Sequence, residues 1–190
     1  MNSFIKRAKD IPRYATSVMF DDSFNDVLYP GDIPISVSSI VFGDSFNQPL
    51  KPMSIPCCVG QLCFGKDFNQ EINLGDIPKS VTTLVFGFSF NQKLKHGVIP
   101  NNVKQLRFGY CFNQTLDPGD IPEGVKYITC GGYTCNPFLK KGVFPSSLTH
   151  LILITGYNKP LSISMIPDFV THVKLKYGEQ DTITLRNKNI

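Results

Sequence analysis

Two histidines are the residues whose spacing in this sequence most directly suggests chemistry. His150 and His172 are separated by 22 residues, which is also the period of a repeat that runs through the chain. Equivalent positions of stacked β coils lie about 4.8 Å apart, so the two imidazoles could share a metal ion or respond to pH. The repeat supplies no third ligand, and Tyr127 is a poor one. The sequence therefore predicts two exposed strand residues and no metal site.

The cysteines show no catalytic or metal-binding spacing. No pair follows the CxxC pattern, and no Cys-His-Asn or Cys-His-Asp set has a geometry that the repeat defines. Cys130 and Cys135 replace phenylalanines of the repeat, which indicates small core residues. We expect all six to be reduced thiols of an intracellular protein: Cys57, Cys58, Cys63, Cys111, Cys130 and Cys135.

The remaining candidate groups predict structure rather than catalysis. The glycines do not form a phosphate-binding pattern. Asp32, Asp76 and Asp120 recur at one turn position, where they could cap turns, but they lack the paired ligands that calcium needs. The sequence thus predicts no catalytic residue, no cofactor site and no enzymatic activity.

Composition and charge limit the classes of partner. The 190 residues are 42% hydrophobic and 18% charged, which excludes a disordered chain and fits one domain with a core. The net charge of +4 is too small to indicate nucleic-acid binding. No apolar run is long enough to cross a bilayer, and the first residues are not a secretory signal. We expect a cytoplasmic protein with no membrane and no nucleic acid as partner.

Two dipeptides repeat in step along the chain. Ile-Pro recurs every 22 residues and Phe-Asn keeps the same interval, with one step of 23 between Pro122 and Asn136. The pairs are Ile11-Pro12, Ile33-Pro34, Ile55-Pro56, Ile77-Pro78, Ile99-Pro100 and Ile121-Pro122, and Phe24-Asn25, Phe46-Asn47, Phe68-Asn69, Phe90-Asn91 and Phe112-Asn113. Both series shift together at the longer step, which shows that the register is real.

Between the two pairs lies V-x-x-L-x-[FL], whose last positions alternate as in a strand with one buried face. One repeat has too few apolar residues for a core, so stacked repeats must turn each position into a ladder. We predict a mainly β fold, a right-handed parallel β-solenoid of about eight 22-residue coils with little or no helix on the convex side. The expected strands lie near 16–20, 38–42, 60–64, 82–86, 104–108, 126–130, 149–153 and 171–176.

Two polar features of the repeat receive structural explanations. The Asn of Phe-Asn is expected to form a buried ladder whose amides satisfy backbone groups of their own turn and of the next coil. The glycines that end the strands, Gly43, Gly65, Gly87 and Gly109, are expected to permit sharp turns.

The motif F-N…I-P with V-x-x-L-x-F-G between its pairs resembles the FNIP repeat family. The resemblance covers roughly residues 11–176 and is close in copies such as Ile77–Gly87 followed by Phe90-Asn91-Gln92. It implies a curved, leucine-rich-repeat-like solenoid that serves as a protein-interaction scaffold in social amoebae and giant viruses of amoebae, so a viral chain would act in its host's cytoplasm. Some members carry an F-box, but ten residues before the first Ile-Pro are too few for one.

The ends are expected to close the solenoid. Residues 1–10 form an N-terminal cap in which Phe4 and Ile5 cover the first coil, while Lys6, Arg7 and Lys9 face water. Residues 11–176 form the solenoid, and 177–190 form a capping strand and tail. Alternation in 173–177 and 182–186 around a polar turn predicts an antiparallel hairpin that covers the last edge.

The outward strand positions are the predicted binding surface. They are apolar or small in the first half of the chain and basic, with His and Tyr, in the second half. The candidate protein-binding residues are Val41, Cys63, Val85, Lys104, Arg107, Lys126, Tyr127, His150, Ile152, His172 and Lys174. The leading hypothesis is a scaffold for an unidentified protein partner. The alternatives are drift of β-forming residues on an exposed sheet, a self-associating structural protein such as a particle component, and a small metal-binding or enzymatic protein.

Overall fold

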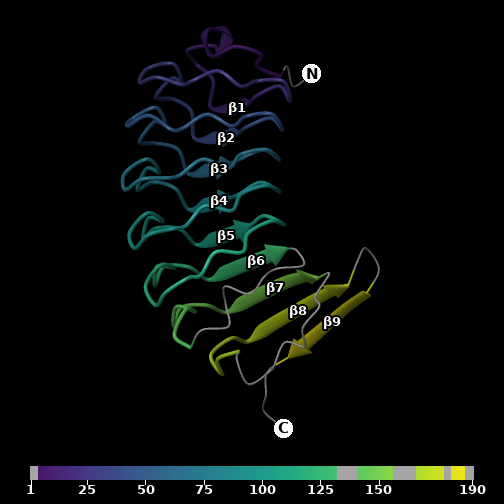
Figure 1. The fold of residues 1–190 in the computed structure, drawn as a ribbon. Coiled ribbons are helices and arrows are strands. Elements are labelled where there is room, and N and C mark those ends of the chain that lie inside the picture. Colours follow the sequence, from purple (N-terminus) through teal and green to yellow (C-terminus); the bar gives the residue numbers. More distant parts are fainter. Residues whose placement is uncertain (1–3, 132–140, 156–165, 178–180, 187–190) are drawn as a thin grey trace.

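The chain forms one continuous sheet whose strands follow each other in sequence order, as the computed structural model shows (Figure 1). The structure describes residues 4–131, 141–155, 166–177 and 181–186. The strands are β1 (Ser17–Met19), β2 (Ser39–Val41), β3 (Gln61–Cys63), β4 (Thr83–Val85), β5 (Gln105–Phe108), β6 (Tyr127–Gly131), β7 (His150–Thr155), β8 (His172–Tyr177) and β9 (Asp181–Arg186). Within the described ranges, the single helical element is the 3₁₀ turn η1 (Ala8–Asp10).

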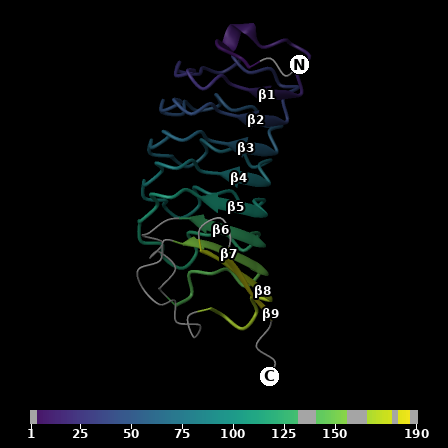
Figure 2. The ribbon, with the colours of Figure 1, turned by 90° about the vertical axis from the view of Figure 1, so that its right-hand side faces the viewer.

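The first eight strands are parallel and pair in the register of the repeat. Ser17 lies opposite Ser39, Gln61 opposite Thr83, and Tyr127 opposite His150. Each coil thus contributes one strand, and the strands stack along one side of the molecule with the turns opposite (Figure 2). The predicted parallel β-solenoid is confirmed, and every observed strand overlaps its predicted range.

The first four strands have only three residues each, although the hydrogen-bonded ladder extends beyond them. The N–H of Ser38 donates to the carbonyl of Thr16 (2.8 Å), and that of Phe42 donates to the carbonyl of Cys63 (2.8 Å). A turn closed by the N–H of Val59 and the carbonyl of Pro56 (3.1 Å) leads into the strand. Coil-to-coil pairing therefore continues where the chain bends too much to count as a strand.

Two ladders of phenylalanine fill the core. One consists of Phe20, Phe42, Phe64, Phe86 and Phe108, and the other of Phe24, Phe46, Phe68, Phe90 and Phe112; all are buried. Neighbouring rings along a ladder stack with centroids 5.2–6.0 Å apart, and the two rings of one coil lie 3.9–4.4 Å apart. Burial of each ring stabilises the fold by about 1.5–3 kcal/mol, which makes these ladders the largest apolar contribution per coil.

The asparagine ladder connects the backbones of successive coils, but it is half-buried or exposed rather than buried as expected. The Asn47 side-chain oxygen accepts a hydrogen bond from the backbone N–H of Asn69 (2.9 Å), and the Asn69 oxygen accepts one from Asn91 (2.9 Å). The same oxygens also accept from the side-chain amides of Gln70 (3.0 Å) and Gln92 (3.1 Å). The Gln residues that follow Asn47, Asn69 and Asn91 thus give each acceptor oxygen of the preceding coil a second donor.

The strand-ending glycines have a different physical reason from the one expected. Their φ angles are not positive; the positive-φ glycines belong to another turn, for example Gly75 at φ 93°. A Cβ on Gly65 would instead collide with the carbonyl oxygen of Gly43, and a Cβ on Gly87 would collide with that of Gly65. Close approach of consecutive coils, not turn geometry, therefore requires glycine here.

Both ends of the stack have a chain segment paired to them. β9 runs antiparallel to β8, with Val173 opposite Leu185, so the predicted hairpin is confirmed; residues 178–180 of its turn and the tail 187–190 lie outside the described residues. At the other end Ile5 forms a bridge with Phe20, and its N–H donates to the carbonyl of Met19 (2.9 Å). Phe4 does not cover the first coil as expected, because it is 55% exposed.

The cysteines are not all reduced. Cys57, Cys58, Cys63 and Cys111 are free thiols, but Cys130 is disulfide-bonded. Cys130 is fully buried in the ladder position that phenylalanine occupies in earlier coils. Its expected role as a core residue is confirmed, whereas its expected reduced state is wrong.

Replacing Gly87 by alanine should destabilise the fold, because the new Cβ must push two coils apart. We expect Gly87→Ala to lower the free energy of unfolding by about 1–3 kcal/mol. The matched control is Gly60→Ala, since a Cβ at Gly60 would meet only the carbonyl oxygen of Ser38, at 3.8 Å. Urea denaturation followed by circular dichroism measures both variants. Equal midpoints would contradict the close-approach explanation.

Removing one rung of the asparagine ladder should also destabilise the fold. Asn69→Ala leaves the backbone N–H of Asn91 without its acceptor and should cost about 1–3 kcal/mol. Asn101→Ala is the matched control, because Asn101 is exposed at a turn outside the ladder. Thermal unfolding compares the two, and a melting temperature for Asn69→Ala as high as that of the control would show that the ladder is not stabilising.

Candidate functional site

The outward face of the sheet carries every candidate residue that the sequence analysis selected. In strand β5 the residues alternate exposed, buried, exposed, buried, so Gln105 and Arg107 face solvent while Leu106 and Phe108 enter the core. The in-register pairing repeats this alternation from coil to coil. Lys104, Arg107, Lys126, Tyr127 and His172 are exposed, and Val41, Cys63, Val85, His150, Ile152 and Lys174 are half-buried. The structure thus brings the predicted residues together on one surface.

The N-terminal half of this face is apolar and chemically quiet. Val41, Cys63 and Val85 form one column along adjacent strands. Burial raises the pKa of the Cys63 thiol above its ordinary value, outweighing the opposing effects of Gln61 and Arg107. The thiol is therefore protonated at neutral pH, which makes it a poor nucleophile.

The C-terminal half of the face is basic, and its charges have no carboxylate partner within the described ranges. The ion pairs of the described residues join Arg7 to Asp10 (3.0 Å) and Lys95 to Glu71 (2.8 Å), and both lie away from this surface. The three outward columns, which in the coil of β5 are Lys104, Gln105 and Arg107, contain no Asp or Glu in any of the eight coils. Positive charge on this half is therefore uncompensated.

A column of three adjacent rings crosses the basic half. The Tyr127 and His150 ring centroids are 4.5 Å apart with the rings tilted by 30°, whereas His150 and His172 stack at 4.2 Å with the rings parallel to within 1°. The prediction that the two histidines lie side by side is confirmed. Burial, and secondarily the charge of His172, lowers the pKa of His150 below its ordinary value.

Two threonines determine which nitrogen of each imidazole is free. The Thr149 hydroxyl lies 2.8 Å from Nδ1 of His150, and the Thr171 hydroxyl lies 2.8 Å from Nδ1 of His172. Each hydroxyl also donates its single proton to a carbonyl of the preceding coil, Thr149 to Lys126 and Thr171 to Thr149, both at 3.2 Å. Both contacts are satisfied together only when Nδ1–H donates to the hydroxyl, which leaves the lone pair on Nε2.

The three aspartates that recur at one turn position have a structural role. Asp32, Asp76 and Asp120 each accept a hydrogen bond from the backbone N–H three residues earlier, all at 2.7 Å, so the predicted turn capping is confirmed. Within the described ranges no group of three or more His, Cys, Asp or Glu side chains could hold a metal ion. The arrangement offers hydrogen-bond donors, positive charge and apolar contact, which are means of binding.

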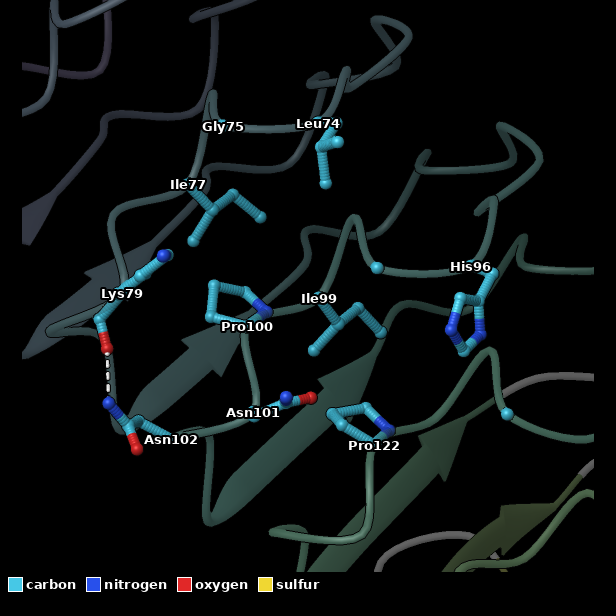
Figure 3. A pocket seen from close by; sticks show the side chains of 12 residues that line it. Leu74, Gly75, Ile77, Lys79, His96, Ile99, Pro100, Asn101, Asn102 and Pro122 are labelled. Carbon is cyan, nitrogen blue, oxygen red and sulfur yellow. Dashed lines mark hydrogen bonds between the residues drawn. The ribbon is translucent and has the colours of Figure 1, made fainter.

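Sequence reasoning missed two shallow grooves on the turn side of the coils. One, of about 490 Å³, is lined by Leu74, Ile77, Ile99, Pro100 and Pro122, with His96 at its side (Figure 3). Its neighbour, of about 550 Å³, contains the exposed side chains of Ile35 and Met53. Met53 has φ 63° at a position that is glycine in other coils. The apolar residues at these turn positions, Ile35, Met53 and Leu74, were the available signal.

The tautomer assignment predicts a spectroscopic difference between histidines. In heteronuclear NMR at pH 8, His150 and His172 should show the Nδ1–H tautomer, whereas His96, which is exposed and follows Lys95 rather than a Thr, should favour Nε2–H. Thr171→Val should shift His172 toward Nε2–H and leave His150 unchanged. Across a pH titration His150 should protonate below its ordinary range. An identical tautomer mixture in all three histidines would contradict the assignment.

Comparisons with known proteins identify the repeat. A solved structure that matches is the crystal structure of CroV588, a protein of the giant virus CroV described as a novel circular LRR protein structure. It superposes with a TM-score of 0.73 at 29% sequence identity and covers 92% of this chain, whereas this chain spans 29% of CroV588. A search of curated proteins finds no relative. In the described part of the chain no helix has the length and apolar character needed to span a membrane. The model of the FNIP repeat matches residues 24–67, 68–111, 112–156 and 139–178, so the chain belongs to the FNIP repeat family.

Proposed function

We propose that this protein is a non-catalytic scaffold that binds a protein partner through the outward face of its sheet. The observation that carries the proposal is the contrast between columns. The inward columns repeat the same apolar residues from coil to coil, whereas the outward columns change from Val41 and Val85 to Arg107 and Lys174. The fold does not fix the outward residues, so they are free to serve recognition.

The chemistry of the site supports binding over catalysis. The Cys63 thiol is held protonated by burial, the turn aspartates are used as caps, and no third polar ligand accompanies His150 and His172 in the described part of the chain. The family and the similarity to an LRR solenoid also favour a binding role. We propose a location inside the cell, in the cytoplasm of a host if the chain is viral, which the free thiols of Cys57, Cys58, Cys63 and Cys111 support and the disulfide at Cys130 does not.

End-to-end self-association is the less favoured alternative. Both ends of the parallel sheet are paired with other segments of this chain, Ile5 at β1 and β9 at β8. A second copy therefore cannot continue the parallel stack directly in the register of the repeat, because the antiparallel β9 ends it. This favours a partner that contacts the side-chain surface of the solenoid.

Two charge-matched double variants test the location of the binding surface. Val85→Glu/Arg107→Glu alters the outward face, and Leu74→Glu/Lys79→Glu makes the same change in charge at exposed residues of the turn side. Tagged wild-type protein and both variants are used as baits in host-cell lysate, with quantitative mass spectrometry of co-purifying proteins and circular dichroism to verify folding. The face variant should reduce specific partner recovery at least about tenfold. An unpaired carboxylate buried in the interface costs more than about 1.4 kcal/mol of binding free energy, which corresponds to a tenfold loss of affinity.

The control should retain the partner at the wild-type level. Loss of the partner only from the turn-side variant would assign binding to the grooves beside Leu74 and would contradict the proposal. Retention by both variants would show that neither surface binds under these conditions, which also contradicts it.

A further inference from the structure

We infer that the basic half of the outward face binds an acidic segment of a protein partner, and that this binding tightens as the pH falls. The inference rests on the proposed function and specifies the chemistry of the partner. It concerns Lys104, Arg107, Lys126 and Lys174 around the column Tyr127–His150–His172, which has no catalytic or metal role assigned to it.

The basic half of the outward face is complementary in charge to an acidic partner. Lys104, Arg107 and Lys126 are exposed, Lys174 is half-buried, and none has a carboxylate partner in the described part of the chain. The outward columns of all eight coils contain no Asp or Glu, so the 15 acidic residues of this chain all lie at other positions. A polyanionic partner meets attraction over the whole half-face and no local repulsion.

The surface is rigid where the partner would contact it. The three rings belong to adjacent hydrogen-bonded strands, the two histidine rings stack, and each imidazole is also held at Nδ1 by a threonine hydroxyl. Little side-chain entropy is left to lose on binding, which is the advantage of a preorganised site. Tyr127, 43% exposed, adds a ring that can contact the apolar parts of the partner's side chains.

The threonine contacts fix the position of the titrating proton. Because Nδ1–H donates to threonine, an added proton goes to Nε2, on the opposite side of each ring from the threonine. Protonation thus creates a charged N–H donor where a carboxylate of the partner can accept from it. At neutral pH the same atom is an uncharged acceptor, which offers a carboxylate nothing.

The groups around the histidines determine the sign of the pH effect. On β7 itself His150 has Thr149 and Ile152 beside it; from the β6 coil come Lys126 and Tyr127, and from β8 come His172 and Lys174. Arg186 of β9 is the register partner of His172, and Lys104 and Arg107 lie one coil beyond Tyr127.

The described side chains around His150 are cationic or neutral, and burial together with the charge of His172 disfavours protonation of His150 in the free protein. A bound carboxylate would favour the protonated form of His150 and raise its pKa. By linkage, affinity then increases as the pH falls through the range where the bound form takes up protons, and it levels off once the free form is protonated too.

The affinity of a fluorescein-labelled ten-glutamate peptide, measured by fluorescence anisotropy at low salt, tests the inference. At pH 5.5 the glutamates remain largely ionised, so a change in affinity from pH 7.5 reports on the protein. Wild type should bind about fivefold tighter at pH 5.5 than at pH 7.5. Arg107→Gln/Lys126→Gln/Lys174→Gln should weaken binding about tenfold at either pH, from three charge contacts of modest strength.

Three controls make the result specific. Lys51→Gln/Lys79→Gln/Lys93→Gln removes the same charge from exposed residues outside the outward columns and should leave affinity within twofold of wild type. His150→Gln/His172→Gln should bind like wild type at pH 7.5 but lose the gain at pH 5.5. A ten-glutamine peptide should not bind.

The contrary outcomes are distinct. Equal loss of affinity in the Arg107/Lys126/Lys174 triple and in the control triple would show nonspecific attraction to net charge. A pH effect that survives in the His150/His172 variant would exclude the imidazoles as its source. Either result overturns the inference. Tighter binding of an oligothymidylate of the same charge, sensitive to the same triple, would assign the surface to nucleic acid instead. If lysate capture depends on Val85 and Arg107 but the peptide does not bind, the proposed scaffold function stands and only the acidic partner is wrong.

Discussion

Each coil of this protein can bury its apolar side chains only against the same side chains of the next coil. Phe42 lies between Phe20 and Phe64, with centroid separations of 5.2 and 5.6 Å, and the same contact repeats along two ladders. Stacking at this distance brings the coil backbones close enough that a Cβ on Gly65 would strike the carbonyl oxygen of Gly43. The close stacking of the coils therefore requires glycine at positions 43, 65, 87 and 109.

The same constraint separates residues that must be kept from residues that can change. An inward position is limited by the residue above and below it, so substitution in one coil affects two interfaces. An outward position contacts its neighbours only along the column, and many side chains satisfy that contact. Thr149 shows how one residue can serve both requirements: its hydroxyl donates to the backbone of the preceding coil and orients the His150 ring. Recognition on this face is therefore built from residues that the ladder already positions.

The periodic features could be predicted from sequence, because in-register stacking converts a constant spacing directly into spatial neighbours. This holds for the strands, the phenylalanine ladders, the turn aspartates and the adjacent histidines. Features that depend on contacts between coils could not be read in the same way. The role of Gly87, the second donor that Gln70 gives the asparagine ladder, the disulfide at Cys130 and the tautomer of His172 all depend on atoms of a neighbouring segment. The grooves beside Leu74 and Met53 arise from turn geometry, which the repeat motif does not describe.

Uncompensated charge on the basic half costs the folded chain little, and this explains how such a surface can persist. Lys104 and Lys126 are exposed, and at physiological ionic strength charges on a surface are screened over about 8 Å. The stacked histidines differ, because their rings are only 4.2 Å apart and His150 is partly buried. The charge of His172 disfavours a proton on His150. Carboxylates placed across both rings would remove that repulsion. The chain can therefore remain stable with this half-face unoccupied, while its charge state responds to whatever covers it.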